Sequence, residues 1–266
     1  MITCLLSRPA IIAGDHAGVT TGKGEDLPLP GGEPLPRTDP GGNLDADIAI
    51  LGLYPAAKVA QRTIAGHKMN LPVQVERTSF EHGVSESGKH LDENYLEPLG
   101  LTREDVLLLD LLPYFLANKR GKKGHTMADN IRTFESLTGE ALGIEARLSP
   151  SKMVGLAREM PGNVERLTDY LSKCRPRLLL TLGVEVAAFI REQAYSRVSR
   201  DVKQYLYRGP VKLDVVGVEV DVVHLAHPGI LMSGRGADWR ILHDRWCEGP
   251  GRKIVGQMVP TQRLRS

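Results

Sequence analysis

Of four short groups of residues, three combine side chains that suit chemistry on a bound ligand, and the fourth, Leu182-Gly183, is interpreted as architecture. The four groups are Gly52-Leu53-Tyr54-Pro55-Ala56-Ala57, Asp110 within a leucine-rich run, Leu182-Gly183, and His227-Pro228. His227 directly follows an apolar run, and Pro228 restricts the chain after it. A histidine at this position can donate a hydrogen bond to developing negative charge, although such a residue also often serves as a satisfied structural group.

Asp110 and the turn at Gly52 allow two interpretations each. A carboxylate among leucines is costly unless it is paired, so Asp110 needs a hydrogen-bond donor. That donor is either a nearby backbone N–H group or the edge of a nucleobase. The turn from Gly52 to Ala57 brings backbone N–H groups close to a ligand or a water molecule, or it only links a strand to a loop.

Four apolar runs and the segments between them predict the elements that position these groups. The runs are Ile48 to Leu53, Val106 to Leu112, Leu178 to Leu182 and Val220 to Ala226. Helical spacing separates them at Leu91 to Leu99, Val164 to Lys173 and Val184 to Val198. This alternation predicts an α/β fold in three layers, with a four-stranded, mainly parallel sheet flanked by helices. In such a fold, ligands bind beyond the carboxyl ends of the strands.

Two further features complete the predicted organisation. Residues 211–216 and 218–223 flank Gly217 and are expected to pair as a hairpin. The Gly- and Pro-rich residues 1–43 predict an irregular arm, 44–250 a single domain, and 251–266 a C-terminal tail.

Composition excludes few classes of function. The chain has 266 residues, 41% of them hydrophobic, and a formal charge of +2, so any nucleic-acid signal must be local. Its three cysteines lie far apart in the sequence, so we expect neither a metal nor another cofactor. Without an apolar run long enough for a signal peptide or a membrane span, we expect a soluble, cytoplasmic monomer that does not bind membranes.

The order and spacing of the four groups resemble the uracil-DNA glycosylase superfamily. Its first motif has the form G-x-x-P after the first strand, and its second is an H-P-x turn after the last strand. The similarity runs from about Ile48 to Trp246 and is strongest to the bacterial branches called families 4 and 5. It includes Gln61-Arg62-Thr63 and the passage from Leu99 to Val106. The resemblance implies an enzyme that flips a base out of DNA and hydrolyses its N-glycosidic bond.

The resemblance implies roles for individual residues. Phe80 would stack on the flipped base, and His227 would stabilise the departing base anion. Gly52, Leu53, Pro55 and Ala56 would line the base pocket beside Tyr54. Tyr54 occupies the position where many members carry a water-positioning Asp, Asn or Glu, yet a phenol is a poor base at neutral pH. The candidates for the water-activating group are therefore the backbone groups of 52–57, Glu76, Glu81 and His82, and the sequence does not decide among them. The iron–sulfur cysteines of the bacterial branches are absent.

The identity of residue 110 bears on the target base. Uracil-directed members usually have Asn at this position, whereas an ionised Asp only accepts hydrogen bonds, as the N4 amino group of cytosine requires. Ala56 is small where uracil enzymes block groups at C5. We therefore expect a C5-modified cytosine, such as glucosylated hydroxymethylcytosine in phage DNA, to be removed in defence against phage. Uracil or another deaminated base is the alternative, and a non-catalytic nucleic-acid-binding module is a further one.

Candidate DNA contacts lie in two loops. Lys119, Arg120, Lys122 and Lys123 are expected to neutralise phosphates, although a basic run is often only a solvated loop. After His227, Leu231 is expected to fill the space left by the flipped base, with Arg235 on a phosphate.

Overall fold

The centre of the protein is a mixed sheet flanked by helices. The computed structural model describes residues 41–53, 58–73, 86–112, 116–117, 127–141, 145–146, 149–231 and 237–258. The strand order is β1-β5-β2-β8-β10-β9. The strand bounds are β1 (Gly41–Gly42), β2 (Ile48–Gly52), β5 (Val106–Asp110), β8 (Leu178–Leu182), β9 (Val211–Val215) and β10 (Val218–Leu225). The inner strands β5, β2, β8 and β10 are parallel, whereas β1 and β9 are antiparallel edges.

The predicted α/β class and mainly parallel sheet are confirmed, but the sheet is wider than the four strands expected. Each of the four apolar runs forms one of the parallel strands, and β2 and β8 are buried along their whole length. The predicted hairpin around Gly217 adds β9, a largely exposed edge strand. The two glycines of β1 pair with Leu107 and Leu108. A two-residue glycine strand has no apolar pattern, so the sequence did not predict it.

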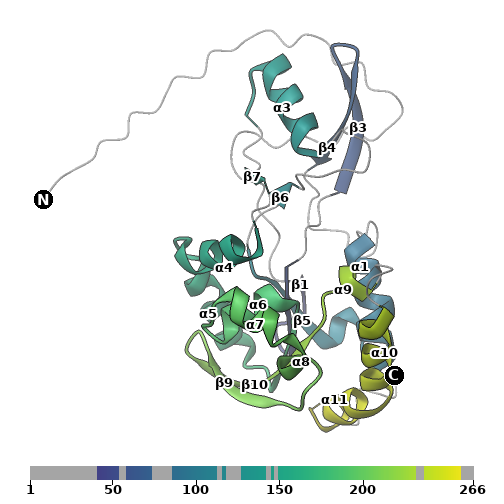
Figure 1. The fold of residues 1–266 in the computed structure, drawn as a ribbon, viewed down its shortest axis with the longest axis vertical. Coiled ribbons are helices and arrows are strands. Elements are labelled where there is room, and N and C mark those ends of the chain that lie inside the picture. Colours follow the sequence, from purple (N-terminus) through teal and green to yellow (C-terminus); the bar gives the residue numbers. More distant parts are fainter. Residues whose placement is uncertain are drawn as a thin grey trace, which may run out of the picture.

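Helices cover both faces of the sheet and complete three layers. One face packs against α4 (Pro150–Glu159), α5 (Asn163–Cys174), α6 (Val184–Ile190) and α7 (Tyr195–Arg200). The other packs against α1 (Glu86–Leu91), the π-helix η1 (Asp92–Leu96), α2 (Glu97–Leu99), α9 (Pro228–Leu231), α10 (Ala237–Trp246), the π-helix η3 (Cys247–Gly251) and α11 (Arg252–Met258). Figure 1 shows the two groups of helices on opposite sides of the strands.

The predicted helices are confirmed at two of three places. The segment Leu91 to Leu99 lies in the run formed by α1, η1 and α2, and Val164 to Lys173 lies in α5. The expected helix from Val184 to Val198 is interrupted, because α6 ends at Ile190 and α7 begins at Tyr195. Between them Glu192 has φ = 52°, a left-handed conformation that a continuous right-handed helix does not allow.

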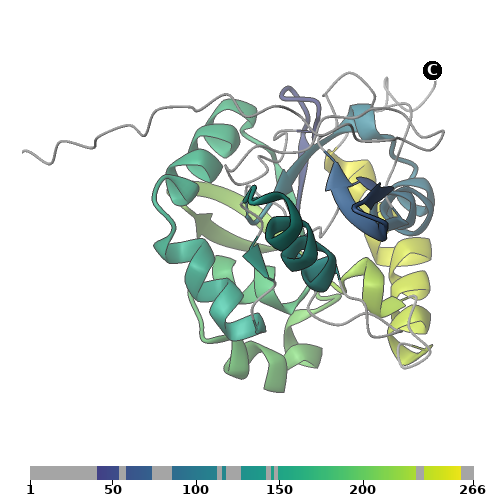
Figure 2. The same ribbon diagram turned by 90° about the horizontal axis from the view of Figure 1, so that it is seen from above.

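A small lobe extends beyond the carboxyl ends of the parallel strands. The hairpin of β3 (Lys58–Ile64) and β4 (His67–Val73) is inserted after β2. A second insertion, after β5, contains β6 (Leu116–Ala117), α3 (Met127–Thr138) and β7 (Glu145–Ala146). Helix α3 packs on β4, burying Met69, Leu71, Ile131 and Phe134 (Figures 1 and 2). The insertion after β2 and the insertion after β5 are therefore in contact through β4 and α3, beyond the carboxyl ends of those two strands.

Ordered elements also lie outside the predicted domain bounds of 44–250. Strand β1 precedes residue 44, and α11 follows residue 250 with its Val255 buried. Most of the predicted arm and the end of the predicted tail lie outside the described residues. Among the helices of the described part, none is both long and apolar enough to span a lipid bilayer.

Candidate functional site

The order of the parallel strands creates a topological switch point at the carboxyl edge of the sheet. Strand β2 is the first of the parallel strands in the chain, and the next two parallel strands lie on opposite sides of it, β5 on one side and β8 on the other. The connection from β2 to β5 therefore leads toward one edge of the sheet and the connection from β8 to β10 toward the other, as at the switch points where α/β proteins bind ligands. Leu53 and Gly183, the first residues after β2 and β8, border this point.

His227 lies over the switch point with a defined ring orientation. Its Nε2 atom is 3.0 Å from the carbonyl oxygen of Leu53, and its Nδ1 atom accepts a hydrogen bond from the backbone N–H of Gly229 at 3.1 Å. An amide N–H only donates and a carbonyl oxygen only accepts, so in the neutral ring the hydrogen is on Nε2. His227 thus presents an N–H donor at the end of β2.

Two glycines make room for this ring. Gly183 has φ = 100°, and a Cβ atom there would lie 3.4 Å from the Cβ of His227. A Cβ atom on Gly229 would lie 3.2 Å from Nδ1 of the ring. The Leu182-Gly183 turn, interpreted from the sequence as architecture, therefore also borders the candidate catalytic histidine.

Asp110 lies at the same edge of the sheet. It is the last residue of β5, is only 8% exposed, and pairs in register with Gly52. The next residue, Leu111, donates its N–H to the Gly52 carbonyl at 2.8 Å. Because side chains alternate along a strand, that of Asp110 leaves the sheet on the same face as Val106 and Leu108, the face covered by α1 and η1. Gly52, Leu53, Asp110 and His227, which were singled out from the sequence, are thus brought to one edge.

Two residues of α5 hold the backbone around Asp110, and sequence reasoning missed both. The guanidinium of Arg166 donates from Nη2 to the Asp110 carbonyl at 2.7 Å, and Asn163 donates from Nδ2 to the Leu111 carbonyl at 3.1 Å. Arg166 also donates to Oδ1 of Asn163 at 2.9 Å. Burial lowers the pKa of Arg166 to about 10, so it remains a cation at neutral pH. An Asn and an Arg three residues apart on a helix form no recognisable motif, so no sequence signal marked them.

Leu231 does not have the exposure that insertion into DNA requires. It is 6% exposed and belongs to the core on the face of the sheet that carries α10. The short helix α9 turns its side chain inward, while the preceding residue, Ile230, is 42% exposed. Ile230 is therefore, among the described residues, an exposed large apolar side chain close to His227 in the sequence.

The remaining predicted site residues lie outside the described part of the chain. They are Tyr54, Pro55, Ala56, Phe80, Lys119, Arg120, Lys122, Lys123 and Arg235. The three candidate water-activating side chains, Glu76, Glu81 and His82, lie outside it as well.

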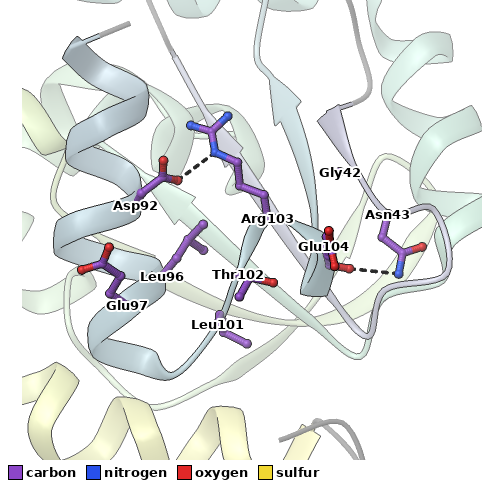
Figure 3. A pocket seen from close by; sticks show the side chains of 9 residues that line it. All are labelled: Gly42, Asn43, Asp92, Leu96, Glu97, Leu101, Thr102, Arg103 and Glu104. Carbon is purple, nitrogen blue, oxygen red and sulfur yellow. Dashed lines mark hydrogen bonds and ion pairs between the residues drawn. The ribbon is translucent and has the colours of Figure 1, made fainter. Parts of the chain in front are cut away.

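A cavity of about 890 Å³ lies away from this edge (Figure 3). It is located beside the amino-terminal end of β5, and its lining includes Asn43, Leu96 and the first two residues of the 3₁₀ turn η2 (Arg103–Asp105). Arg103 donates from Nε to Asp92 at 2.8 Å within it. Since β5 begins here and ends at Asp110, the cavity and the His227 edge lie at opposite ends of the strand.

The described side chains offer no obvious metal site. Among these residues, no three His, Cys, Asp or Glu side chains are grouped so as to hold an ion. Cys174 and Cys247 are buried, and burial raises the pKa of the two thiols to about 11 and about 12. Both are protonated at neutral pH and are poor ligands in that form.

The sequence matches no model of a known protein family, and it matches no curated protein.

Proposed function

We propose that the protein is a DNA glycosylase that removes a C5-modified cytosine, such as glucosylated hydroxymethylcytosine, from phage DNA. In the reaction, water adds to C1′ of the sugar as the C1′–N1 bond breaks. The bonding electrons leave with the base, and the products are an abasic site and a free base. The carrying observation is the pair of contacts made by the His227 ring: Gly229 donates to Nδ1, and Nε2 faces the Leu53 carbonyl at the end of β2, so the hydrogen of the neutral ring lies on Nε2.

The Nε2 hydrogen of His227 suits the charge that develops in this reaction. The departing base becomes an anion, and a preorganised N–H donor stabilises it more strongly than it stabilises the neutral substrate. In the structure this hydrogen is directed at the carbonyl oxygen of Leu53, so in the proposed reaction the base anion takes the place of that carbonyl as the acceptor. An uncharged donor also avoids the cost of keeping an imidazolium in a partly buried site.

Asp110 supports the choice of a cytosine. Its position at the end of β5, paired with Gly52, puts its carboxylate at the same edge as His227. An ionised carboxylate accepts hydrogen bonds from the N4 amino group of cytosine but repels the O4 atom of uracil. An enzyme that reads only this edge would also attack ordinary cytosine, so the proposal includes a requirement for a C5 substituent, admitted by the small side chain of Ala56.

DNA contacts in the proposal come from both sides of this edge. Ile230, 42% exposed and three residues after His227, replaces Leu231 as the side chain that inserts where the base has left. The basic residues Lys119 to Lys123 belong to the insertion between β6 and α3. The flanking elements β6 and α3 are part of the lobe beyond the strand ends (Figure 1), so the basic residues, which lie outside the described part of the chain, are proposed to contact phosphates.

A strand-cleavage assay tests the proposal. Oligonucleotides that carry one glucosylated hydroxymethylcytosine, hydroxymethylcytosine, cytosine, uracil or hypoxanthine are incubated with the full chain and then treated with alkali. We expect cleavage only at the modified cytosines, and none with His227→Ala. Cleavage at uracil or hypoxanthine alone would contradict the target and favour a repair enzyme. Binding of DNA without any abasic site would favour a non-catalytic module.

A further inference from the structure

The backbone of Ala226, directly before His227, is held on both sides by tyrosine hydroxyl groups. The preceding residue, Leu225, still accepts a hydrogen bond from the Gly183 N–H at 2.9 Å. Beyond it, the Ala226 N–H donates to the hydroxyl oxygen of Tyr207 at 3.3 Å, and the Ala226 carbonyl accepts from the hydroxyl of Tyr95 at 2.6 Å. Ala226 is 2% exposed, so water cannot readily replace these partners.

Both tyrosines are held in uncommon backbone conformations. Tyr207 has φ = 59°, which is strained for a bulky residue, and its N–H donates to the His224 carbonyl at 2.8 Å. Tyr95 is fully buried within the π-helix η1. Strained residues and π-helical turns are concentrated at functional sites, where the surrounding structure maintains them. The conformations are thus a second observation, independent of the hydrogen bonds to Ala226.

A chain of hydrogen bonds connects the two tyrosines and fixes the direction of each bond. Nε2 of His243 lies 2.5 Å from the carbonyl oxygen of Asn94, so it bears the hydrogen, and Nδ1 lies 3.2 Å from the Tyr207 hydroxyl. Burial lowers the pKa of His243, so the ring is neutral and Nδ1 accepts from Tyr207. The Tyr207 oxygen is then left to accept from Ala226. Asn94 directly precedes Tyr95, whose hydroxyl bonds to Ala226, so the series of contacts leads back to Ala226.

We propose that Tyr95 and Tyr207 are positioning residues for His227, because they hold the two backbone groups of the residue before it and so set where its N–H donor points. The inference rests on the proposed function, in which that donor stabilises the base anion. His227 follows Ala226 directly and meets Leu53 at 3.0 Å, so a shift of Ala226 would carry the ring away from the end of β2. Displacement by about 1 Å is enough to slow a reaction by roughly 100-fold.

Single-turnover kinetics on the full chain test the proposal with Tyr207→Phe and Tyr95→Phe. Each change removes one hydroxyl and keeps the ring. We expect the excision rate constant per active molecule to fall about 10- to 100-fold, with the Kd for substrate DNA unchanged. Tyr205→Phe is the matched control, because the Tyr205 hydroxyl bonds to Gln193 at 3.1 Å instead of to Ala226, and we expect it to retain the wild-type rate constant. Equal rate constants in all variants would overturn the proposal.

Nuclear magnetic resonance gives a second reading that needs no catalytic activity. In the wild type we expect slow hydrogen exchange at the Ala226 amide and the imidazole nitrogen shifts of a single Nε2–H tautomer for His227. In Tyr207→Phe we expect faster exchange at Ala226 and averaged His227 shifts. Unchanged signals would overturn the positioning role. If the wild type releases no base from any oligonucleotide, the proposed function fails, while these signals still decide whether the tyrosines position His227.

Discussion

The Nε2 atom of His227 lies 3.0 Å from the carbonyl oxygen of Leu53, a residue 174 positions earlier in the chain. The contact joins the first residue after β2 to the turn that follows β10. It also determines which ring nitrogen bears the hydrogen, because Gly229 donates to the other.

Replacement of His227 by Ala removes the proposed donor to the base anion. We expect the single-turnover rate of base release to fall about 10²- to 10³-fold, the usual effect of losing one preorganised donor. The matched control is His67→Ala at the exposed turn of the β3–β4 hairpin, which should retain the wild-type rate. A loss of less than tenfold for His227→Ala would mean that another group stabilises the anion.

Replacement of Asp110 by Asn alters the pattern of donors and acceptors offered to the base. An amide donates as well as accepts, so we expect activity on modified cytosine to fall at least about 10-fold and activity on uracil to appear or rise. Relative rates on paired oligonucleotides measure the change. Asp169→Asn, on the exposed part of α5, serves as the control. The same base preference in wild type and Asp110→Asn would remove the basis for proposing cytosine.

Truncation of Ile230 to Ala tests insertion into the duplex. We expect excision from double-stranded DNA to fall roughly 10-fold, because nothing would fill the gap in the base stack, while excision from single-stranded DNA changes little. Ile241→Ala is a matched control, since Ile241 is 51% exposed on α10. An equal loss on both forms of DNA would contradict insertion by Ile230.

Gly183→Ala combines a backbone cost with an effect on His227. Its φ of 100° and the 3.4 Å approach to the Cβ of His227 predict both lower stability, by at least about 1 kcal/mol, and slower excision. In Gly139→Ala the backbone is also left-handed, with φ = 71°, but nothing lies within 4 Å of the added Cβ. That variant should lose stability without losing its rate per folded molecule. Thermal unfolding and active-site titration separate the two effects.

His224 should make the fold sensitive to acid. It is 2% exposed, its Nε2 accepts from Arg191 at 2.9 Å, and Nδ1 lies 2.5 Å from the Thr181 hydroxyl. Burial, and then the charge of Arg191, lower its pKa from 6.5 to about 3. Between these values the unfolded chain binds a proton that the folded chain does not bind. The free energy of unfolding should therefore fall with decreasing pH, by up to about 1.4 kcal/mol per pH unit.

Denaturant unfolding from pH 7 to pH 4 measures this dependence. His224→Gln should reduce the slope, whatever its effect on stability at pH 7, because it removes a group that titrates. Some slope should remain, because burial also lowers the pKa of His243. An unchanged slope would show that His224 does not titrate differently in the two states.

Local patterns in the sequence were sufficient for the class of fold and for part of the site. The four continuous apolar runs became the four parallel strands because strands buried on both faces need apolar side chains at every position. Parallel strands end at a common edge, so the placement of Gly52, Leu53, Asp110 and His227 at one edge followed from the runs. The two-residue β1 lacks such a run, and β9 was predicted as a hairpin strand but was not counted in the sheet, so the width of the sheet was underestimated.

Only the tertiary structure decided which of two adjacent apolar residues is buried and what holds the turn before His227. Leu231 is buried and Ile230 is exposed because of the side that α9 turns toward the core. A helix of four residues is too short for its apolar pattern to predict that side. The hydroxyl of Tyr95 bonds to the carbonyl of Ala226, which is 131 positions away in the sequence. The spacing of residues around Tyr95 does not predict that contact. The periodicity of apolar residues indicates which side chains of one helix or strand are buried. Hydrogen bonds between distant elements depend instead on how those elements pack, which is a property of the whole fold.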